Sequence, residues 1–353
     1  MTSWATPPHR TRAPPHPWPP DVTASEASQD ANEAQDQAGE AVESAAPQAC
    51  DNTVGTDPLG PSYENPVRRP PAVSQRGPRL ATVDPMRIAT WNVNSIRARA
   101  DRIEAWLDRS DVDVLAIQET KAKDENFPWE LFEFAGYEVA HFGVNQWNGV
   151  AIASRVGLKD VERTFPGQPT FGKPGQEPAQ EARAIAATCD GVRIWSLYVP
   201  NGRGLEDPHM PYKLEWLRVL EGHAEQWLQE DPQAQIALVG DWNVAPRDED
   251  VWDIQLFRDG GYTHVSEPER AAFNAFIEDA GFQDVVRERH PGPGVYTYWD
   301  YTQLRFPKKE GMRIDFQLCS PALAARVQDA WIDREERKGK GASDHAPVVI
   351  EID

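Results

Sequence analysis

Short apolar runs that favour β-strands alternate with segments of helical spacing from residue 86 to residue 353. Strand-like runs are predicted at residues 87–93, 112–118, 149–154, 182–189, 193–198, 236–240, 312–319 and 346–352. Helical spacing is predicted over residues 96–107, over residues 212–229 and after Ser266. One open sheet rarely carries this many strands. We therefore expect an α/β fold in the form of a four-layer sandwich, with two packed mixed β-sheets flanked by helices.

Two of the predicted helices carry recognisable local signals. In the first, Ile103, Trp106 and Leu107 repeat at a spacing that places them on one apolar side. In the last, Ser266 and Glu269 form an S-x-x-E capping box directly before an apolar helical pattern. These signals predict that both helices lie with one face against a sheet.

The first 85 residues lack this periodic pattern. They contain 15 of the 31 prolines and an alanine- and acid-rich run over residues 26–43. Such a segment buries too little apolar surface to offset its ordering entropy. We predict a disordered tail at residues 1–85 and one catalytic domain at residues 86–353, with Met86 as a candidate internal start. The tail could recruit a protein partner.

The charge and the cysteines narrow the class of protein. The formal net charge of −20 argues against a protein that passively coats nucleic acid, although an enzyme that touches few phosphates is compatible with it. The sequence has no apolar run of about 18 residues, no secretory signal and no CxxC motif. We expect no membrane partner and a cytoplasmic location. No glycine-rich phosphate-binding motif follows any predicted strand, which argues against dinucleotide binding.

Six polar runs capable of chemistry adjoin the predicted strands. They are WNVN (91–94), QETK (118–121), YVPNG (198–202), GDWN (240–243), RIDF (313–316) and SDHAP (343–347). We expect them at the carboxyl ends of strands, where ligand sites gather in α/β proteins. Each also has an ordinary interpretation when taken alone. Glu119 could be a solvated loop acid, Asp241 a turn former and His345 a structural histidine.

Together the six runs resemble the exonuclease III family of AP endonucleases, within the endonuclease/exonuclease/phosphatase superfamily. The resemblance extends over residues 86–353 in the order and spacing of the family. It implies a monomeric, Mg2+-dependent DNA-repair nuclease, with Mn2+ able to substitute for Mg2+. The expected substrate is duplex DNA, especially abasic or 3'-blocked DNA. The expected reactions are incision 5' to abasic sites and removal of nucleotides or blocking groups from 3' ends, close to the nucleoid of a bacterium.

The resemblance also implies which residues bind the metal and the water. Glu119 would be the principal metal ligand with Asn92 beside it, because a hard cation prefers carboxylate and amide oxygens. Asp344 would complete or adjoin the metal shell. Asp241 would orient or deprotonate the attacking water, and Asn243 would hold that water or a phosphate oxygen. Both residues are also expected within reach of the metal.

Contacts to the scissile phosphate are implied in the same way. His345 would donate a hydrogen bond to this phosphate and lie close to the metal. Asp315 would fix the tautomer of His345 and favour its charged form. Tyr198 and Asn201 would contact the same phosphate. Because some bacterial members carry glutamine where Asn201 stands, the reach of this contact is shorter here.

Substrate selection depends on an aromatic run and on basic residues. In the family, residues at the positions of Tyr298 and Trp299 line a small pocket for a sugar that lacks its base. From the pattern alone, residues 296–301 could equally form a strand with one aromatic face in the core. Lys121 and Arg313, together with basic residues between 308 and 340, could neutralise DNA phosphates.

Two alternatives stay open at this point. The same superfamily fold serves phosphodiesterases and phosphatases that act on substrates other than DNA, and the run QETK with the aromatic run favours the DNA branch. A binding module without catalytic activity is the second alternative. It predicts loss of residues such as Glu119, Asp241, Asn243, Asp315 or His345, all of which are present.

Overall fold

The computed structural model describes residues 85–172 and 175–353. These residues all belong to one unit, Tyr63–Asp353. The predicted tail lies outside the described residues except for residue 85, so its disorder stays a prediction.

The first sheet holds six strands in the order β11-β12-β1-β2-β4-β3. Its members are β1 (Met86–Asn92), β2 (Val114–Gln118), β3 (Glu138–Phe142), β4 (Val150–Ser154), β11 (Val327–Ile332) and β12 (Val348–Ile352). The central pair β1 and β2 is parallel, whereas β12 runs antiparallel to β1 and β4 antiparallel to β2. The sheet is therefore mixed.

The second sheet repeats this plan in the order β5-β6-β7-β8-β10-β9. Its members are β5 (Lys159–Arg163), β6 (Ala184–Cys189), β7 (Val192–Tyr198), β8 (Ile236–Asp241), β9 (Gln283–Asp284) and β10 (Asp315–Cys319). Here β7 and β8 form the parallel central pair, and β10 runs antiparallel to β8.

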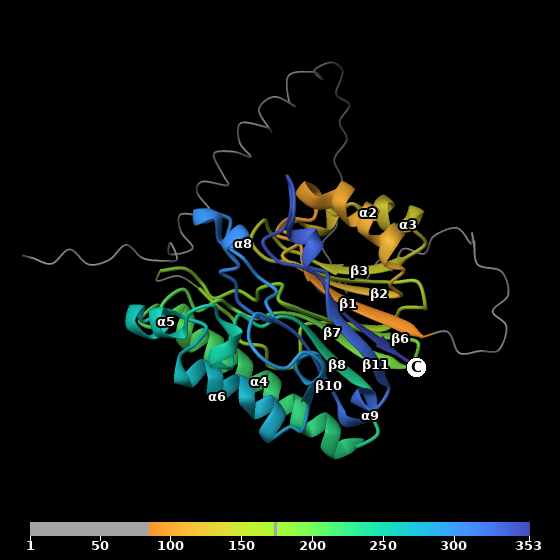
Figure 1. Ribbon diagram of the computed structural model, residues 1–353. Coiled ribbons are helices and arrows are strands. Elements are labelled where there is room, and N and C mark those ends of the chain that lie inside the picture. The colour runs from red at the N-terminus through yellow and green to blue at the C-terminus, as the bar shows by residue number, and fades with distance from the viewer. Residues whose placement is uncertain (1–84, 173–174) are drawn as a thin grey trace, which may run out of the picture. The chain divides into compact units, whose positions relative to one another are not determined.

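Helices cover the outer faces of both sheets. The α-helices are α2 (Ala100–Ser110), α3 (Trp129–Phe134), α4 (His209–Glu230), α5 (Ile254–Gly260), α6 (Glu267–Glu278), α7 (Val285–Arg289), α8 (Arg305–Lys308) and α9 (Pro321–Ala324). Short 3-10 helices occur at η1 (Arg97–Arg99), η2 (Asp124–Asn126), η3 (Asp248–Asp250), η4 (Thr302–Leu304) and η5 (Arg334–Arg337). Helices α2 and α3 lie on the first sheet, and α4 and α6 lie on the second (Figure 1).

Three apolar cores hold these four layers together. The middle core lies between the sheets and contains residues of both, such as Ile88 and Val239. The core under α2 and α3 contains Trp106 and Phe132. The core under α4 and α6 includes Trp216, which is fully buried. Since alternate residues of a strand face opposite sides, each central strand contributes to two of the cores.

The structure confirms the predicted fold class of two mixed sheets flanked by helices. Every predicted strand is present with ends that differ by at most three residues, and Ile103, Trp106 and Leu107 are the buried residues of α2. The capping box of Ser266 and Glu269 is formed at the start of α6. Four strands were not predicted, among them the edge strand β5, whose sequence KDVER is largely exposed and gives no apolar alternation.

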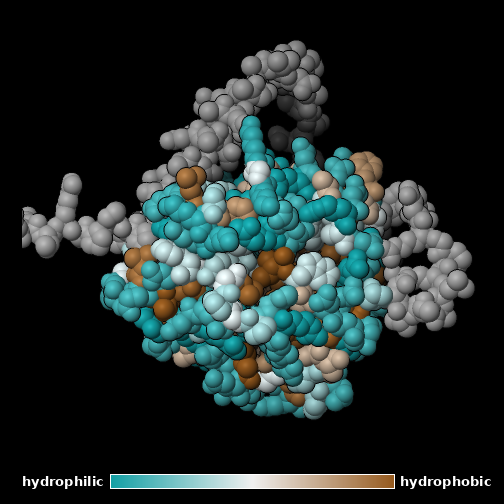
Figure 2. All heavy atoms as spheres, in the orientation of Figure 1, coloured by the Kyte–Doolittle hydropathy of each residue, from teal (hydrophilic) through white to brown (hydrophobic). Residues whose placement is uncertain are grey.

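The visible surface is mainly hydrophilic, with separate apolar patches rather than one continuous area (Figure 2). The large apolar side chains that stay exposed are Phe134, Val144, Trp147, Leu205, Tyr301 and Leu304. Among the described residues, no helix combines the length and the apolar character needed to cross a bilayer.

Candidate active site

The ends of the central strands bring the predicted residues to one edge of the sandwich. Asn92 ends β1, Tyr198 ends β7 and Asp241 ends β8. Asp315 begins β10 and pairs with Asp241 across the sheet, because β10 is antiparallel to β8. His345 precedes β12, which is antiparallel to β1. The expectation that all six polar runs follow strands was therefore wrong for two of them, which reach the same edge from the starts of antiparallel strands.

Asn92 connects two carboxylates of the site. Its side chain is fully buried, and its Nδ2 donates to Glu119 Oε1 at 3.1 Å and to Asp241 Oδ2 at 3.0 Å. Its Oδ1 accepts the backbone N–H of Asn94 at 3.0 Å. One amide group thus lies between two carboxylates that are 122 residues apart in the sequence and come from different sheets.

Glu119 lies in a strongly polar setting and is not a solvated loop acid. Tyr198 donates its hydroxyl to Glu119 Oε1 at 2.7 Å, and Lys121 Nζ lies 2.9 Å from Oε2. Burial by itself raises the pKa of Glu119, but Lys121, Tyr198 and the charge of His345 outweigh it and lower the pKa to about 2. The residue has a left-handed backbone at φ 52°, a costly conformation for a glutamate that the surrounding contacts hold in place. The carboxylate is therefore charged at neutral pH.

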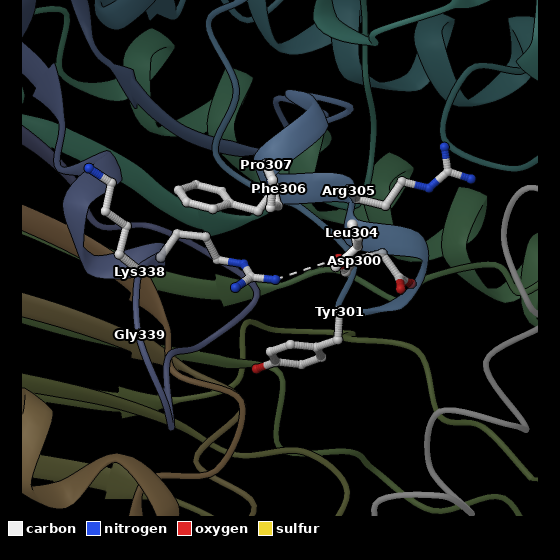
Figure 3. A pocket seen from close by; sticks show the side chains of 9 residues that line it. Asp300, Tyr301, Leu304, Arg305, Phe306, Pro307, Lys338 and Gly339 are labelled. Atoms are coloured by element: carbon white, nitrogen blue, oxygen red, sulfur yellow. Dashed lines mark hydrogen bonds between the residues drawn. The ribbon is translucent and has the colours of Figure 1, made fainter.

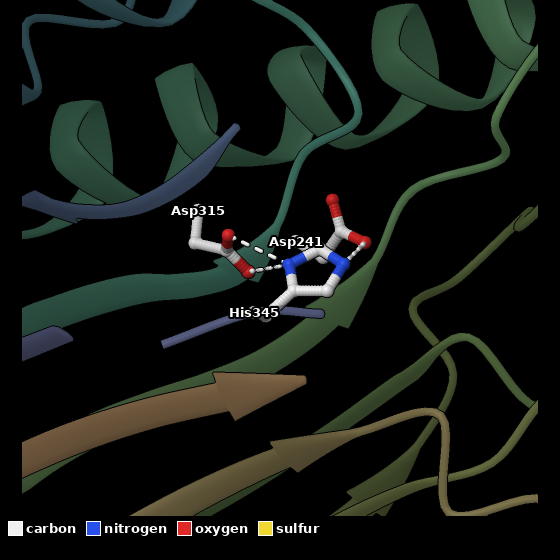
Figure 4. Close-up of side chains that lie close together, drawn as sticks. All are labelled: Asp241, Asp315 and His345. Carbon is white, nitrogen blue, oxygen red and sulfur yellow. Dashed lines mark hydrogen bonds and ion pairs between the residues drawn. The ribbon is translucent and has the colours of Figure 1, made fainter. Parts of the chain in front are cut away.

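His345 lies between two aspartates (Figure 4). Its Nδ1 is 2.8 Å from Asp315 Oδ2, and its Nε2 is 3.8 Å from Asp241 Oδ2. Burial by itself lowers the pKa of His345, but the carboxylates, with Asp315 first, raise it to about 10. The pKa of Asp241 rises to about 8, because burial and the neighbouring Asp315 and Glu119 outweigh the opposite effect of His345. The imidazole is thus held as a cation whose Nδ1–H points to Asp315.

Replacing Asp315 by asparagine is expected to move the alkaline limb of the pH-rate profile to lower pH. A raised histidine pKa keeps the charged ring present up to about pH 10. Without the Asp315 carboxylate, burial lowers this pKa and the charged ring is lost earlier as pH rises. Profiles of kcat between pH 6 and 10.5 would measure the shift. The matched control is Asp344→Asn, since Asp344 raises the pKa of His345 less. An alkaline limb that does not move would contradict the assignment.

The side chain of Asn243 has several hydrogen-bond partners, and one of them, His264, was not predicted from the sequence. Its Oδ1 accepts Asn201 Nδ2 at 3.1 Å and lies 3.1 Å from His264 Nε2. Its Nδ2 donates to Val199 O at 2.9 Å, and its backbone N–H donates to Asp241 Oδ1 at 3.0 Å. The structure therefore places Asn201 and Asn243 in direct contact. His264 had no sequence signal beyond its place just before the capping box at the start of α6.

Lys213 connects the two loops that carry Asn201 and Asn243. It is fully buried on α4, and its Nζ donates to Asn201 O, Asn243 O and Glu269 Oε1 at 3.1, 2.6 and 2.5 Å. Sequence reasoning missed it, although a signal was present: Lys213 occupies the apolar stripe of α4 with Leu217 four residues later. A lysine in such a stripe needs a buried partner.

The Lys213→Met variant is expected to lose roughly 3–5 kcal/mol of unfolding free energy, because it leaves Glu269 buried without its counter-charge. The matched control is Lys338→Met. Lys338 makes an ion pair of similar length, 2.6 Å, with Glu335, but both side chains are exposed, so its loss should change stability little. Urea denaturation of the three proteins measures the difference. Equal midpoints for Lys213→Met and Lys338→Met would contradict a structural role for the buried pair.

Asp344 lies at the rim of the site, to which it is connected by a hydrogen bond with Asn94. Asn94 Nδ2 donates to Asp344 Oδ1 at 3.0 Å, and Lys121 Nζ donates to Asn94 Oδ1 at 2.7 Å. Asp344 is only partly buried, unlike Asp241 and Asp315. This chain of contacts connects Asp344 to Glu119 through Lys121.

The aromatic run places one ring in the site and one in the core. The Tyr298 ring lies 4.8 Å from the His345 ring, centroid to centroid. Trp299 is 1% exposed and packs against Phe306 and the guanidinium of Arg334. The alternative of a regular strand is wrong, because the run forms only isolated bridges, from Tyr298 to Met312 and to His345. Of the two predicted pocket residues, the structure brings only Tyr298 to the site.

Arg313 lies away from any surface that DNA could reach. Its side chain is 1% exposed and pairs with Asp250 at 2.7 Å and with Asp284 at 2.7 Å. Asp250 also pairs with Arg287. A buried and paired guanidinium holds η3 and α7 against the start of β10 instead of binding a phosphate. The predicted substrate contact of Arg313 is not compatible with this placement.

A cavity of about 290 Å³ lies next to the aromatic run (Figure 3). Tyr301, Leu304, Phe306, Arg337 and Lys338 are among the residues that line it. The hydroxyl of Tyr301 accepts from Arg99 and donates to Ala342 O, both at 2.8 Å.

The residues at this edge fit a hard divalent cation. The donors are carboxylates and amides, which a hard cation prefers. The pKa of Asp241 is raised first by burial and then by the neighbouring Asp315 and Glu119, whose charge a cation would offset. Among the described residues, Asp241, Asp315 and His345 also have possible ligand atoms that all lie within 4.8 Å of one another.

Comparison with known proteins shows the family of this chain. A model of the Endonuclease/Exonuclease/phosphatase family matches residues 89–345. Exodeoxyribonuclease III of Haemophilus influenzae is 30% identical over 278 residues, which span 76% of this chain and 100% of that protein.

Solved structures show the same likeness. A 3' phosphatase, NExo from Neisseria, bound to product DNA hairpin, is 35% identical, with a TM-score of 0.70 over 76% of this chain and 99% of that chain. An AP endonuclease from Archaeoglobus fulgidus is 34% identical, with a TM-score of 0.68 over 76% and 99% of the two chains.

Proposed function

Because the chain belongs to the Endonuclease/Exonuclease/phosphatase family, and within it to the exodeoxyribonuclease III group, we propose that it is a DNA-repair nuclease. It hydrolyses phosphodiester bonds of duplex DNA 5' to abasic sites and removes nucleotides or blocking groups from 3' ends. The observation that carries this proposal is the convergence of Glu119, Asn92, Asp241 and the Asp315–His345 pair at one edge of the sandwich.

Glu119 and Asn92, with Asp241 opposite, would hold the divalent cation. When bound, Mg2+ supplies charge that neutralises a phosphate oxygen, and Mn2+ offers the same chemistry. Asn243 Oδ1 is occupied by Asn201 and His264, and His345 Nδ1 by Asp315. We therefore assign these two residues to the substrate rather than to the cation, which narrows the ligand set expected from the sequence. Asp344 contributes to the charge at the rim.

Asp241 acts as the general base in this proposal. The backbone N–H of Asn243 and the amide of Asn92 hold one carboxylate oxygen each, so the group is fixed in orientation. The carboxylate accepts a proton from the attacking water as the new P–O bond forms. The bond between phosphorus and the 3' oxygen breaks, and that oxygen leaves with a proton from solvent.

His345 and Tyr198 stabilise the charge that develops on the phosphate. The Nδ1 of His345 is held by Asp315, which leaves Nε2–H as the donor that faces the reacting group. The one O–H of Tyr198 donates to Glu119 Oε1, so a contact from this O–H to the phosphate replaces that hydrogen bond. Donors fixed before the reaction stabilise the transition state without reorganising.

Substrate choice is supported by the position of Tyr298 and by basic residues around the site. The Tyr298 ring packs beside His345 and narrows the space next to the scissile phosphate, so a sugar without its base is favoured. Lys121 contacts Asn94 beside the site, Arg99 donates to the hydroxyl of Tyr301, and Lys338 lines the neighbouring cavity. These cations offer phosphate contacts in a protein that is acidic as a whole.

The test is to incubate the full chain and Mg2+ with a duplex that carries one abasic analogue. The proposal predicts a single cut 5' to the analogue and slower trimming of an undamaged recessed 3' end. An undamaged duplex without ends and an inositol phosphate serve as controls. Hydrolysis of the inositol phosphate alone would replace this proposal by the superfamily alternative. Binding of the duplex without any cleavage would favour a non-catalytic module.

Four further expectations stay predictions. They are the monomeric state, the partner of residues 1–85, the boundary of the catalytic domain at residue 86 and the location near the nucleoid.

A further inference from the structure

The hydrogen bonds of the Asn243 side chain leave only one of its donors and acceptors without a partner in the protein. An asparagine amide offers two N–H donors and two acceptor sites. Asn201 Nδ2 and His264 Nε2 face its Oδ1, both at 3.1 Å, and one Nδ2–H donates to Val199 O. Both acceptor sites and one donor are thereby used. What remains is a single N–H.

The same contacts fix which ring nitrogen of His264 carries the proton. Because Asn243 Nδ2 donates to Val199 O, the atom that faces His264 is the carbonyl oxygen. A hydrogen bond there requires a proton on Nε2, and Asn201 Nδ2, 3.4 Å from Nε2, then donates to Asn243 Oδ1 alone. The Thr263 hydroxyl lies 3.1 Å from both Asn201 O and His264 Nδ1, and its one proton then goes to Nδ1, while Asn201 O keeps its hydrogen bond from Lys213. Burial and the charge of Lys213 lower the pKa of His264 to about 4, which agrees with a neutral ring that carries one proton.

His264 is held in place from the backbone. Its N–H donates to Glu269 Oε1 at 2.9 Å, and its carbonyl accepts the backbone N–H of Ala245 at 2.7 Å. Glu269 in turn binds Lys213, which donates to the carbonyl of Asn243. The residue has φ 78°, a conformation that a histidine keeps only where surrounding contacts enforce it. The ring position is thus determined by the same closed set of contacts that positions Asn243.

On these grounds we infer that His264 is a positioning residue of the active site, which locks Asn243 so that it can only donate to substrate. An amide locked in this way offers an N–H to a phosphate oxygen or to the oxygen of the attacking water, and its own oxygen has no acceptor site left for a hydrogen bond from that water. Deprotonation then falls to Asp241, whose carboxylate the Asn243 backbone already holds. This inference rests on the proposed nuclease function.

Three variants at position 264 test the role in the full-length protein with Mg2+ and the abasic duplex. His264→Met removes the donor and is expected to lower kcat by about 10- to 100-fold with KM changed by less than about 3-fold. His264→Gln restores an N–H of similar reach and should recover kcat to within about 3-fold of the wild type. His264→Glu has the same shape as glutamine but directs an acceptor at Asn243 Oδ1, so it should resemble His264→Met.

A double-mutant cycle separates this role from a general structural one. In an Asn243→Ala background, His264→Met should change the single-turnover rate by less than about 2-fold, because its target is gone. Wild-type kcat in His264→Met, equal losses in the Gln and Glu variants, or a full effect in the Asn243→Ala background would each overturn the inference. If His264→Met does not fold, the Gln and Glu pair decides alone. A wild-type protein that does not cleave DNA would instead overturn the proposed function.

Discussion

The Asp241→Asn variant is expected to cleave an abasic duplex at least about 10^3-fold more slowly than the wild type, with little change in duplex affinity. In the wild type, each carboxylate oxygen of Asp241 accepts an N–H, from Asn243 and from Asn92. An asparagine at this position must turn its NH2 group toward one of these donors. The variant therefore lacks the carboxylate that acts as base, and its side chain is no longer oriented by two hydrogen bonds. Single-turnover kinetics at saturating enzyme measure the chemical step directly.

The matched control for this substitution is Asp190→Asn. Asp190 is exposed in the turn between β6 and β7, where its φ of 44° suits asparagine as well as aspartate. The control should therefore cleave at the wild-type rate. Cleavage by Asp241→Asn within about 10-fold of the wild type would remove Asp241 from the role of base. A loss of duplex binding that accounts for the whole effect would have the same consequence.

Removal of divalent cations is expected to lower the cleavage rate by on the order of 10^3- to 10^4-fold, because a cation at a transferring phosphate contributes several kcal/mol. The charged Glu119 and the amide of Asn92 supply oxygen ligands that suit Mg2+, and no cysteine lies among the residues that form this edge. Dialysis against a chelator followed by titration with Mg2+ or Mn2+ measures the loss and its recovery.

The location of the cation is tested in the same titration with Glu119→Gln. Losing the charged ligand should raise the Mg2+ concentration for half-maximal rate by at least about 10-fold, because ligand charge largely sets the affinity for a hard cation. Lys123→Gln, a substitution at an exposed side chain in the following loop, serves as the control and should leave that concentration unchanged. Full activity in chelator, or an unchanged Mg2+ requirement in Glu119→Gln, would contradict the assignment.

Local patterns in the sequence were sufficient to predict the fold class. The strands β1, β2, β7 and β8 are buried along nearly their whole length, so their apolar runs are unbroken and easy to recognise. The edge strand β5 is largely exposed and carries no such run. Its existence depends on pairing with β6, which is a contact between segments that local sequence does not describe.

The chemical identities of the site residues were also present in the sequence, but their partners were not. Asn201 follows a strand in the printed sequence, yet its contact with Asn243 depends on the loops that Lys213 ties together. Arg313 shows the opposite case. It stands two residues before Asp315 and so looked like a site residue, but it precedes the start of β10, and its guanidinium is buried against Asp250 and Asp284.

The sequence by itself determined the element types, the sandwich and the set of groups able to bind a cation and move a proton, because these follow from local periodicity and from side-chain chemistry. Only the tertiary structure decided that Asp315 holds His345 Nδ1, that Asn92 lies between Glu119 and Asp241, and that His264 belongs to the site at all. The physical reason is that strand pairing brings distant segments to one edge. Neighbours in space, and not neighbours in sequence, then decide which donors and acceptors already have a partner. They also decide which remain to bind substrate.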